Sequence, residues 1–244
     1  MGNINLGDYK IDITFVIDAT GSMGPIIQQV QDAVLVMHNK IVEGLEESGR
    51  HVAQLRINVI DFADYGTEGD EAIHQSGFFQ MTMSEELPQF ENWVRNLNYL
   101  NRGGDLPENG LEALYYAMQA EWTPLIGVKG RHIIVLITDA APLALGERSG
   151  CAGYPDGYFP ANNIELEAVW NEDDPVQGGD KKAPISCNGR RLILYVPNDP
   201  AWAPISGWEW TTTTYIQAAR GGFDLNIDNI VADIVRSAVQ DEEE

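Results

Sequence analysis

Residues 11–22 read Ile-Asp-Ile-Thr-Phe-Val-Ile-Asp-Ala-Thr-Gly-Ser, and this stretch decides the fold of the chain. Residues 11–17 are mostly β-branched or aromatic, which is typical of a buried strand. The strand ends at Asp18, after which Gly21 allows a tight turn and Pro25 favours the first turn of a helix. A strand, a loop and a helix in this order predict the first unit of an α/β fold.

The loop after this strand carries side-chain oxygens at alternate positions, on Asp18, Thr20 and Ser22. Carboxylate and hydroxyl oxygens together suit a hard divalent cation such as Mg²⁺ or Mn²⁺ better than zinc. Thr20 and Ser22 are also residue types that commonly cap a helix. The sequence therefore leaves two interpretations of the hydroxyls, as metal ligands or as caps of the helix that follows.

Strands and helices alternate along the rest of the chain. Further strands are expected at 53–62, around 73–81 at a sheet edge, at 132–138, at 191–196 and near 215–218. Helices are expected at 25–47, after residue 84, through 111–118, within 162–170 and at 226–239. This alternation predicts a single domain over 1–244 with a Rossmann-like, doubly wound, mostly parallel sheet flanked by helices. The loop-rich stretch 141–188 is interpreted as an insertion and 240–244 as an acidic tail.

Two other acidic residues are expected near Asp18. Asp139 directly follows the apolar strand 132–138, so it too lies at a carboxyl strand end, where open α/β sheets bind their ligands. Asp105 follows two glycines in a loop and is a third candidate, although it equally suits an Asx turn or a helix N-cap. Asp64, in the loop after the second strand, is interpreted as a turn residue.

At this point the sequence resembles the von Willebrand factor A family. The stretch Asp-Ile-Thr-Phe-Val-Ile-Asp-Ala-Thr-Gly-Ser-Met is similar to that family's D-x-S/T-x-S signature. Leu-Ile-Thr-Asp-Ala-Ala-Pro resembles its third loop, and Gly-Gly-Asp-Leu-Pro-Glu resembles the second loop of many intracellular members. The resemblance covers residues 8–140 well and the remainder in outline.

The resemblance implies a metal-ion-dependent adhesion site and a non-enzymatic module that binds protein partners. Its metal ligands would be Asp18, Thr20, Ser22, Asp105 and Asp139, and its ion Mg²⁺, Mn²⁺ or Ca²⁺. A partner would contribute a carboxylate to the ion or present a basic surface. Intracellular members often act as subunits beside AAA+ ATPases of the MoxR type. Many adhesive members carry a neutral Thr where this chain has Asp105, and the extra carboxylate would leave the ion less positive charge to attract a partner's carboxylate.

The composition of the chain restricts the classes of partner and the cellular location that we expect. The net charge of −22 disfavours nucleic acid and anionic membranes, both of which need a basic protein face. Residues 1–8 contain no basic segment and no apolar core of a secretion signal, so we expect a cytoplasmic protein. Cys151 and Cys187 are too few for a disulfide scaffold, and in a reducing cytosol we expect two free thiols.

The insertion and the tryptophans leave alternatives open. The insertion residues Cys151, Tyr154, Tyr158 and Phe159 either line the rim of the metal face or simply pack a long loop. Trp202, Trp208 and Trp210 either form an exposed anchor for a partner or cover the sheet.

A competing function is a Mg²⁺-dependent phosphohydrolase on a Rossmann-like sheet. Haloacid-dehalogenase-like phosphatases place an aspartate after the first strand but require a second acidic residue two positions on, where this chain has Thr20. None of its histidines matches a catalytic motif. A dinucleotide-binding oxidoreductase is excluded because Ala-Thr-Gly-Ser-Met-Gly lacks the three glycines of the G-x-G-x-x-G pattern.

Overall fold

The computed structural model describes residues 9–97, 107–172, 185–216 and 226–240. Its strands are β1 (Tyr9–Asp18), β2 (Val52–Phe62), β3 (Ile73–Gln75), β4 (Phe79–Gln80), β5 (Gly130–Ile137), β6 (Arg190–Pro197) and β7 (Thr211–Ile216). They form one sheet in the order β3-β2-β1-β5-β6-β7, with β4 also paired to β2. The pairs β1–β2, β1–β5, β5–β6 and β6–β7 are parallel, whereas β3 and β4 run antiparallel to β2. The predicted mostly parallel sheet is confirmed.

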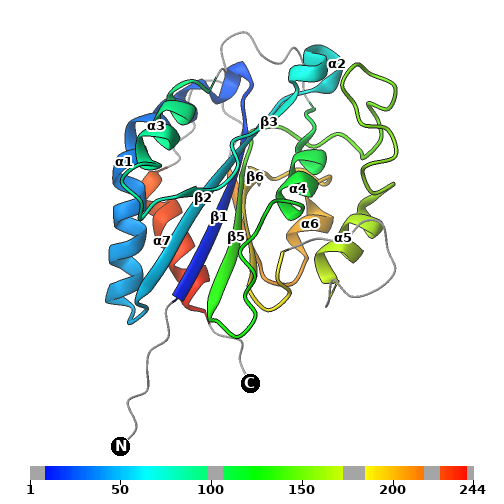
Figure 1. Cartoon of the computed structure of the whole chain (residues 1–244). Helices are drawn as coiled ribbons and strands as arrows, with labels where there is room; N and C mark the ends of the chain where they lie inside the picture. Colours follow the sequence, from blue (N-terminus) through cyan, green and yellow to red (C-terminus); the bar gives the residue numbers. More distant parts are fainter. Residues whose placement is uncertain (1–8, 98–106, 173–184, 217–225, 241–244) are drawn as a thin grey trace, which may run out of the picture.

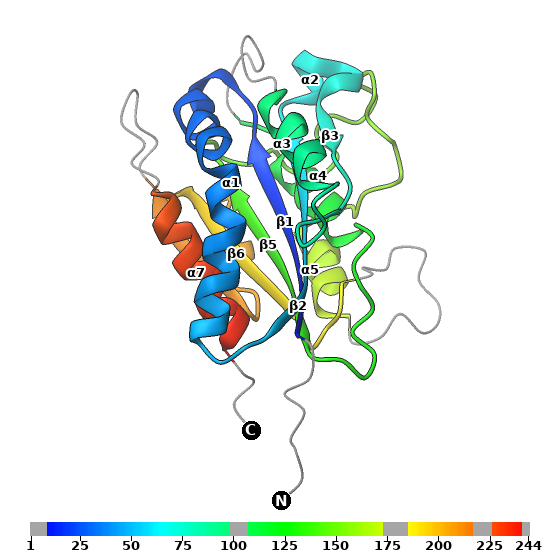
Figure 2. The same cartoon turned by 60° about the vertical axis from the view of Figure 1, so that its left-hand side comes forward.

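Helices cover both faces of this sheet (Figure 1). They are α1 (Gly24–Glu47), α2 (Tyr65–Glu68), α3 (Leu87–Arg95), α4 (Gly110–Met118), α5 (Asn163–Asn171), α6 (Ala203–Ser206) and α7 (Ile227–Val239), with short 3₁₀ turns η1 (Gly21–Met23) and η2 (Gly69–Glu71). Helices α1, α3 and α7 lie on one face, and α4, α5 and α6 lie on the other. Figure 2 shows α1 and α7 side by side across the first of these faces.

The central strands are apolar on both sides because each side meets a helical layer. In β5, Ile133, Val135 and Ile137 belong to the core beneath α1 and α7, while Ile134 and Leu136 belong to the core beneath α4. All five side chains are completely buried. A continuous apolar run is therefore what a parallel strand covered on both faces requires, and the expected strand 132–138 is confirmed.

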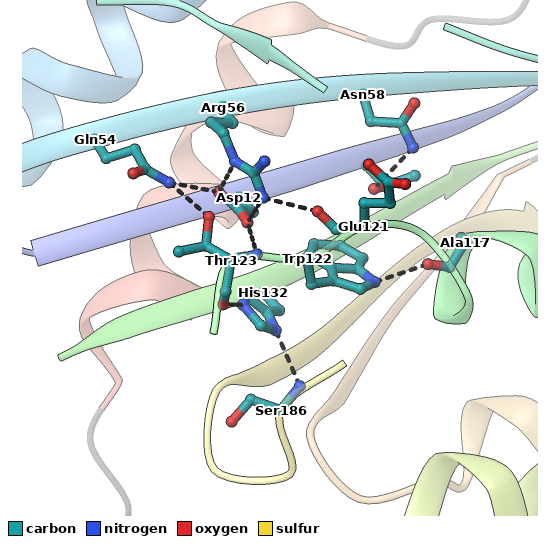
Figure 3. A network of polar contacts seen from close by, with 11 residues as sticks. Asp12, Gln54, Arg56, Asn58, Ala117, Glu121, Trp122, Thr123, His132 and Ser186 are labelled. Carbon is teal, nitrogen blue, oxygen red and sulfur yellow. Dashed lines mark hydrogen bonds and ion pairs between the residues drawn. The ribbon is translucent and has the colours of Figure 1, made fainter. Parts of the chain in front are cut away.

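A buried polar network ties the amino-terminal parts of the central strands together (Figure 3). Asp12 on β1 accepts from Arg56 Nε at 2.9 Å and from the backbone N–H of Thr123 at 2.6 Å. On β5, His132 Nδ1 accepts from the backbone N–H of Ser186 at 3.0 Å, so its Nε2 carries the proton and donates to the Thr123 carbonyl at 2.9 Å. Both ring nitrogens of neutral His132 are thus satisfied.

Two sequence expectations need correction in this part of the fold. The last strand begins at Thr211 instead of near residue 215, within the stretch expected to be a connection, because its four consecutive threonines are β-branched and suit a strand. The expected single edge strand at 73–81 is divided into the two short antiparallel strands β3 and β4.

No helix in the described part of the chain is long and apolar enough to cross a membrane.

Candidate metal centre

The carboxyl end of β1 places Asp18 between its two neighbouring strands. Asp18 is aligned with Phe62 of β2, and Ile17 is aligned with Ile137 of β5. The residue after Ile137 is Thr138, so its side chain comes beside that of Asp18. Asp18 is completely buried, which is exceptional for an acidic residue unless its carboxylate is satisfied.

Both carboxylate oxygens of Asp18 accept hydrogen bonds. Oδ1 accepts from the backbone N–H of Thr20 at 2.9 Å and from its hydroxyl at 2.7 Å. Oδ2 accepts from the Thr138 hydroxyl at 2.6 Å, and that hydroxyl in turn accepts from the Ala140 N–H at 3.0 Å. The loop after β1 and the loop after β5 are therefore joined through one buried carboxylate.

The line of oxygens continues outward to the surface. The hydroxyls of Thr20 and Ser22 lie 3.3 Å apart, and Ser22 Oγ donates to Asp139 Oδ1 at 3.0 Å. Ser22 is exposed and Asp139 half-buried, so the outer end of the line faces solvent. The structure thus brings together Asp18, Thr20, Ser22 and Asp139, while Asp105 lies outside the described residues.

The structure does not show the hydroxyls of Thr20 and Ser22 acting as helix caps. Thr20 occupies the N-cap position of η1 without a side-chain cap bond, and Met23 precedes α1. The hydroxyls are turned toward the carboxylates instead. Their orientation depends on the turn, in which Met23 N–H donates to the Thr20 carbonyl at 3.0 Å.

The electrostatics of this line favour a bound cation. Burial raises the pKa of Asp18 to about 6, and the charge of Asp139 adds to this, although the three hydrogen bonds from Thr138 and Thr20 oppose it. Burial likewise raises the pKa of Asp139, against the bond from Ser22. Two carboxylates with raised pKa values that lie near one another are stabilised in their charged form by a divalent ion.

The donor chemistry fits Mg²⁺, Mn²⁺ or Ca²⁺. These ions take oxygen ligands, and the four described side chains supply carboxylate and hydroxyl oxygens with no nitrogen or sulfur. Within the described ranges there is no group of three or more His, Cys, Asp or Glu side chains that could hold a metal. The site therefore depends on its hydroxyls.

Sequence reasoning missed two contacts that support this edge of the sheet. The first is the hydrogen bond that Thr138 donates to Asp18. The register of β1 against β5 would have indicated this contact. Asp64, expected to be a plain turn residue, accepts from Gly66 N–H at 2.9 Å and pairs with Arg148 Nη2 at 2.7 Å. This buried carboxylate ties the loop after β2 to the insertion, and no local pattern marks it.

Most of the aromatic side chains singled out in the insertion are buried. Tyr154 and Phe159 are buried, and the Tyr154 hydroxyl donates to the buried Glu112 on α4 at 3.2 Å. Tyr158 remains 41% exposed. Cys151 and Cys187 are both free in the structure.

The tryptophans cover the sheet and do not form an exposed anchor. Trp202 and Trp208 are buried in the core beneath α4, and Trp210 packs against it. Trp202 Nε1 also donates to the Ala140 carbonyl at 3.0 Å, which holds the loop after Asp139 in place. Of the two alternatives for these tryptophans, the structure therefore supports the one in which they cover the sheet.

The arrangement of sheet and helices is that of von Willebrand factor A structures. No protein-family model and no curated protein matches the chain. Among solved structures, the pilus adhesin SpaC from Lactobacillus rhamnosus GG matches with a TM-score of 0.53 and 12% identity, over 96% of this chain and 31% of the adhesin. Its open conformation matches with a TM-score of 0.51 and 12% identity, over 97% and 31%.

Proximal thread matrix protein 1 from the mussel byssus, described with a zinc-occupied MIDAS motif, matches with a TM-score of 0.48 and 13% identity, over 95% of this chain and 48% of that protein. A similarity of this size supports no conclusion about the present chain. The chain spans less than a third of the adhesin it matches, and an identity of 12% establishes the shared fold alone.

Proposed function

We propose that this chain is a divalent-cation-dependent protein-binding module of the von Willebrand factor A type that performs no catalysis. The observation that carries the proposal is the unbroken line of oxygens from Asp18 through Thr20 and Ser22 to Asp139. It lies at the carboxyl-terminal edge of a parallel sheet, where folds of this class bind ligands.

Each residue has a distinct part in holding the ion and presenting it. Ser22 and Thr20 would offer hydroxyl oxygens, and Asp18 and Asp139 the negative charge. Bound Mg²⁺, Mn²⁺ or Ca²⁺ would supply a Lewis-acidic position that a partner's carboxylate can occupy. Thr138 keeps Asp18 oriented from behind, and the exposed Ser22 leaves the outer side accessible to a macromolecule. The net charge of −22 additionally favours a partner with a basic surface around that carboxylate.

The burial of Asp18 argues against the phosphohydrolase alternative. A nucleophilic aspartate must reach the substrate, but Asp18 is completely buried and both of its oxygens accept hydrogen bonds. Thr20, which occupies the position where a phosphatase would need its second acid, is itself a donor to Asp18. These contacts suit an anchoring carboxylate better than a reacting one.

The cellular setting belongs to the proposal as well. The resemblance of the loop Gly-Gly-Asp-Leu-Pro-Glu to that of many intracellular members implies a cytoplasmic subunit or adaptor, beside a MoxR-type AAA+ ATPase. Co-purification of the chain with such an ATPase in Mg²⁺, and its loss in EDTA and in Ser22→Ala, is the expected result. Equal recovery under all three conditions would contradict a metal-dependent contact.

Thermal unfolding tests the ion itself. The protein is freed of metal with EDTA and melted alone and with Mg²⁺, Mn²⁺ or Ca²⁺, beside Ser22→Ala and Asp139→Asn. An ion at a hundredfold excess over its dissociation constant stabilises the native state by about 2.7 kcal/mol, which raises Tm by about 5 to 10 °C for a domain of this size. Both variants should lose that shift, whereas Ser84→Ala, an exposed serine elsewhere, should keep it. Absence of any shift in the wild type would refute the metal site.

A further inference from the structure

A completely buried carboxyl group lies beneath the insertion and takes no part in the candidate metal centre. It belongs to Glu112, in the first turn of α4. The core that α4 shares with β1 and β2 is apolar, and it includes Val16, Ile60 and Phe62. An acidic side chain is rarely buried to this extent unless a cation or several donors accompany it. The contacts of Glu112 therefore decide its protonation state.

The insertion contacts Glu112 through a neutral donor. The Tyr154 hydroxyl donates to Glu112 Oε1 at 3.2 Å and accepts from the backbone N–H of Gly146 at 3.0 Å. In the described part of the chain, Glu112 Oε2 is buried and makes no hydrogen bond. Arg148, a cation of the insertion, pairs with Asp64 instead. A charged Glu112 would thus have no cation to compensate it.

These contacts suit the protonated acid. A buried carboxylate without a cation is unfavourable because it loses its hydration. In the neutral acid, Oε1 accepts from Tyr154 and the proton is carried by Oε2. Burial accordingly raises the pKa of Glu112, although the nearby Asn109 amide, the helix backbone, and the donors Tyr154 and Gly146 oppose this.

The titratable groups that face Glu112 from other elements are the phenols of Tyr65 and Tyr154. Burial raises the pKa of both phenols, and the charge of Glu112 contributes to this, so they stay neutral when Glu112 ionises. Tyr116 lies one turn further along α4, and burial raises the pKa of its phenol too. The charged side chains on the surrounding elements are Asp64, Glu68, Glu108, Glu147, Arg148 and Asp156.

The bond to Glu112 acts on a whole segment of the insertion through Tyr154. The centroid of the Tyr154 ring lies 5.2 Å from that of Tyr65 at the end of β2 and 5.2 Å from that of Phe159. Its hydroxyl also holds Gly146, as described above. One side chain thus joins both ends of the segment 146–159 to α4.

We propose that Glu112 and Tyr154 form a proton-dependent latch that holds the segment 146–159 against α4. The latch is closed while Glu112 is protonated. When the proton passes to solvent, the carboxylate requires water, and the segment moves away from α4 to admit it. Because the folded pKa is raised, this docking is present at low pH and lost as pH rises through that pKa. The insertion follows Asp139 closely in the chain, so the latch makes the surface beside the candidate metal centre responsive to pH.

Amide hydrogen exchange in EDTA tests the latch, with protection factors that correct for the intrinsic effect of pH on exchange. In the wild type, protection at 146–159 should fall at least tenfold from pH 5 to pH 9, while protection at 133–137 in β5 should not fall. Glu112→Gln keeps the shape and the acceptor but does not titrate, so its protection at 146–159 should not fall either.

Glu121→Gln is the matched control, because Glu121 is an exposed acid shortly after the same helix. It should behave like the wild type. Asp18, whose pKa of about 6 lies in the same range, is present in all three proteins and does not distinguish them. A wild type whose protection at 146–159 does not fall, or an equal fall in Glu112→Gln, would overturn the proposal.

Tyr154→Phe tests the other half of the latch. It removes the donor to Glu112 and the acceptor of Gly146 while it keeps the aromatic ring. Protection at 146–159 should therefore be at least threefold lower than in the wild type at pH 5. Equal protection would show that the segment does not depend on this hydroxyl and would overturn its role. Because exchange is measured without divalent ions, failure of the proposed metal site would leave these results unchanged.

Discussion

His132 provides the sharpest prediction about stability and pH. Its side chain is buried, its Nδ1 accepts from Ser186 in the chain before β6, and its ring is stacked on Trp122 at a centroid distance of 4.8 Å. Burial lowers its pKa from 6.5 to about 4, with Arg56 adding to this, while Asp12 and the bond to Thr123 oppose it. A proton added at Nδ1 would also point at the Ser186 N–H, which now donates to that nitrogen.

The direction in which stability changes with pH follows from the linkage between protonation and folding. Because the folded pKa lies below the unfolded one, the unfolded chain binds more protons between pH 6.5 and about 4, so stability falls as pH falls through that window. The change in the pKa of His132 from 6.5 to about 4 corresponds to roughly 3 kcal/mol of free energy of unfolding. About 2 kcal/mol of this is lost by pH 5. The lowered pKa of Asp12 places the titration of that carboxyl below this window.

Urea unfolding at pH 7.5 and 5.0 measures this contribution. The quantity compared is the loss in free energy of unfolding between the two pH values, because His132→Gln also changes packing by an amount that does not depend on pH. The wild type should lose about 2 kcal/mol more than His132→Gln over this interval. His51→Gln, at an exposed histidine, should lose as much as the wild type. Equal losses in the wild type and His132→Gln would refute the assignment of a buried neutral imidazole.

Three further predictions concern the contacts around the candidate metal centre. Thr138→Val keeps the shape of the side chain but removes the donor to Asp18, and it should weaken Mg²⁺ binding by about ten- to a hundredfold in calorimetric titration. Arg148→Met leaves the carboxylate of Asp64 buried without its cation and should destabilise the protein by about 3 kcal/mol in urea. Adding Asp64→Asn to it should recover part of that loss, and additive losses would argue against a coupled pair. Trp202→Phe removes the bond to the Ala140 carbonyl and should cost about 1 to 3 kcal/mol, whereas an unchanged urea midpoint would contradict that role.

The elements that depend on local pattern were predicted well. The helix expected at 25–47 is α1, and the expected strand 132–138 is β5, because apolar periodicity and β-branched composition act within a few residues of sequence. The strand near 215 was placed too late because Thr211 to Thr214 were assigned to the preceding connection, although β-branched threonines suit a strand. Boundaries of this kind depend on which neighbour pairs with the strand, here β6.

The sequence indicated four neighbouring side chains of the candidate metal centre, but it did not indicate the contacts between them. Asp18 and Asp139 end strands that are adjacent in a parallel sheet, so their proximity followed from the expected architecture. The bond from Thr138 to Asp18 required the register of β1 against β5. The bond between Ser22 and Asp139, which are separated by 117 positions, required the path of the loop as well.

The sequence by itself determined the strand–loop–helix unit at residues 11–22, the order of the elements and the oxygen-rich chemistry of the loop. Those features depend on residue type and on spacing along the chain. Only the tertiary structure decided that Asp64 pairs with Arg148, that Trp202 is buried, and that the arginines of β5 and β6 meet at Gln240. Such contacts join residues far apart in sequence, and strand register and packing, which no local pattern encodes, bring their side chains together.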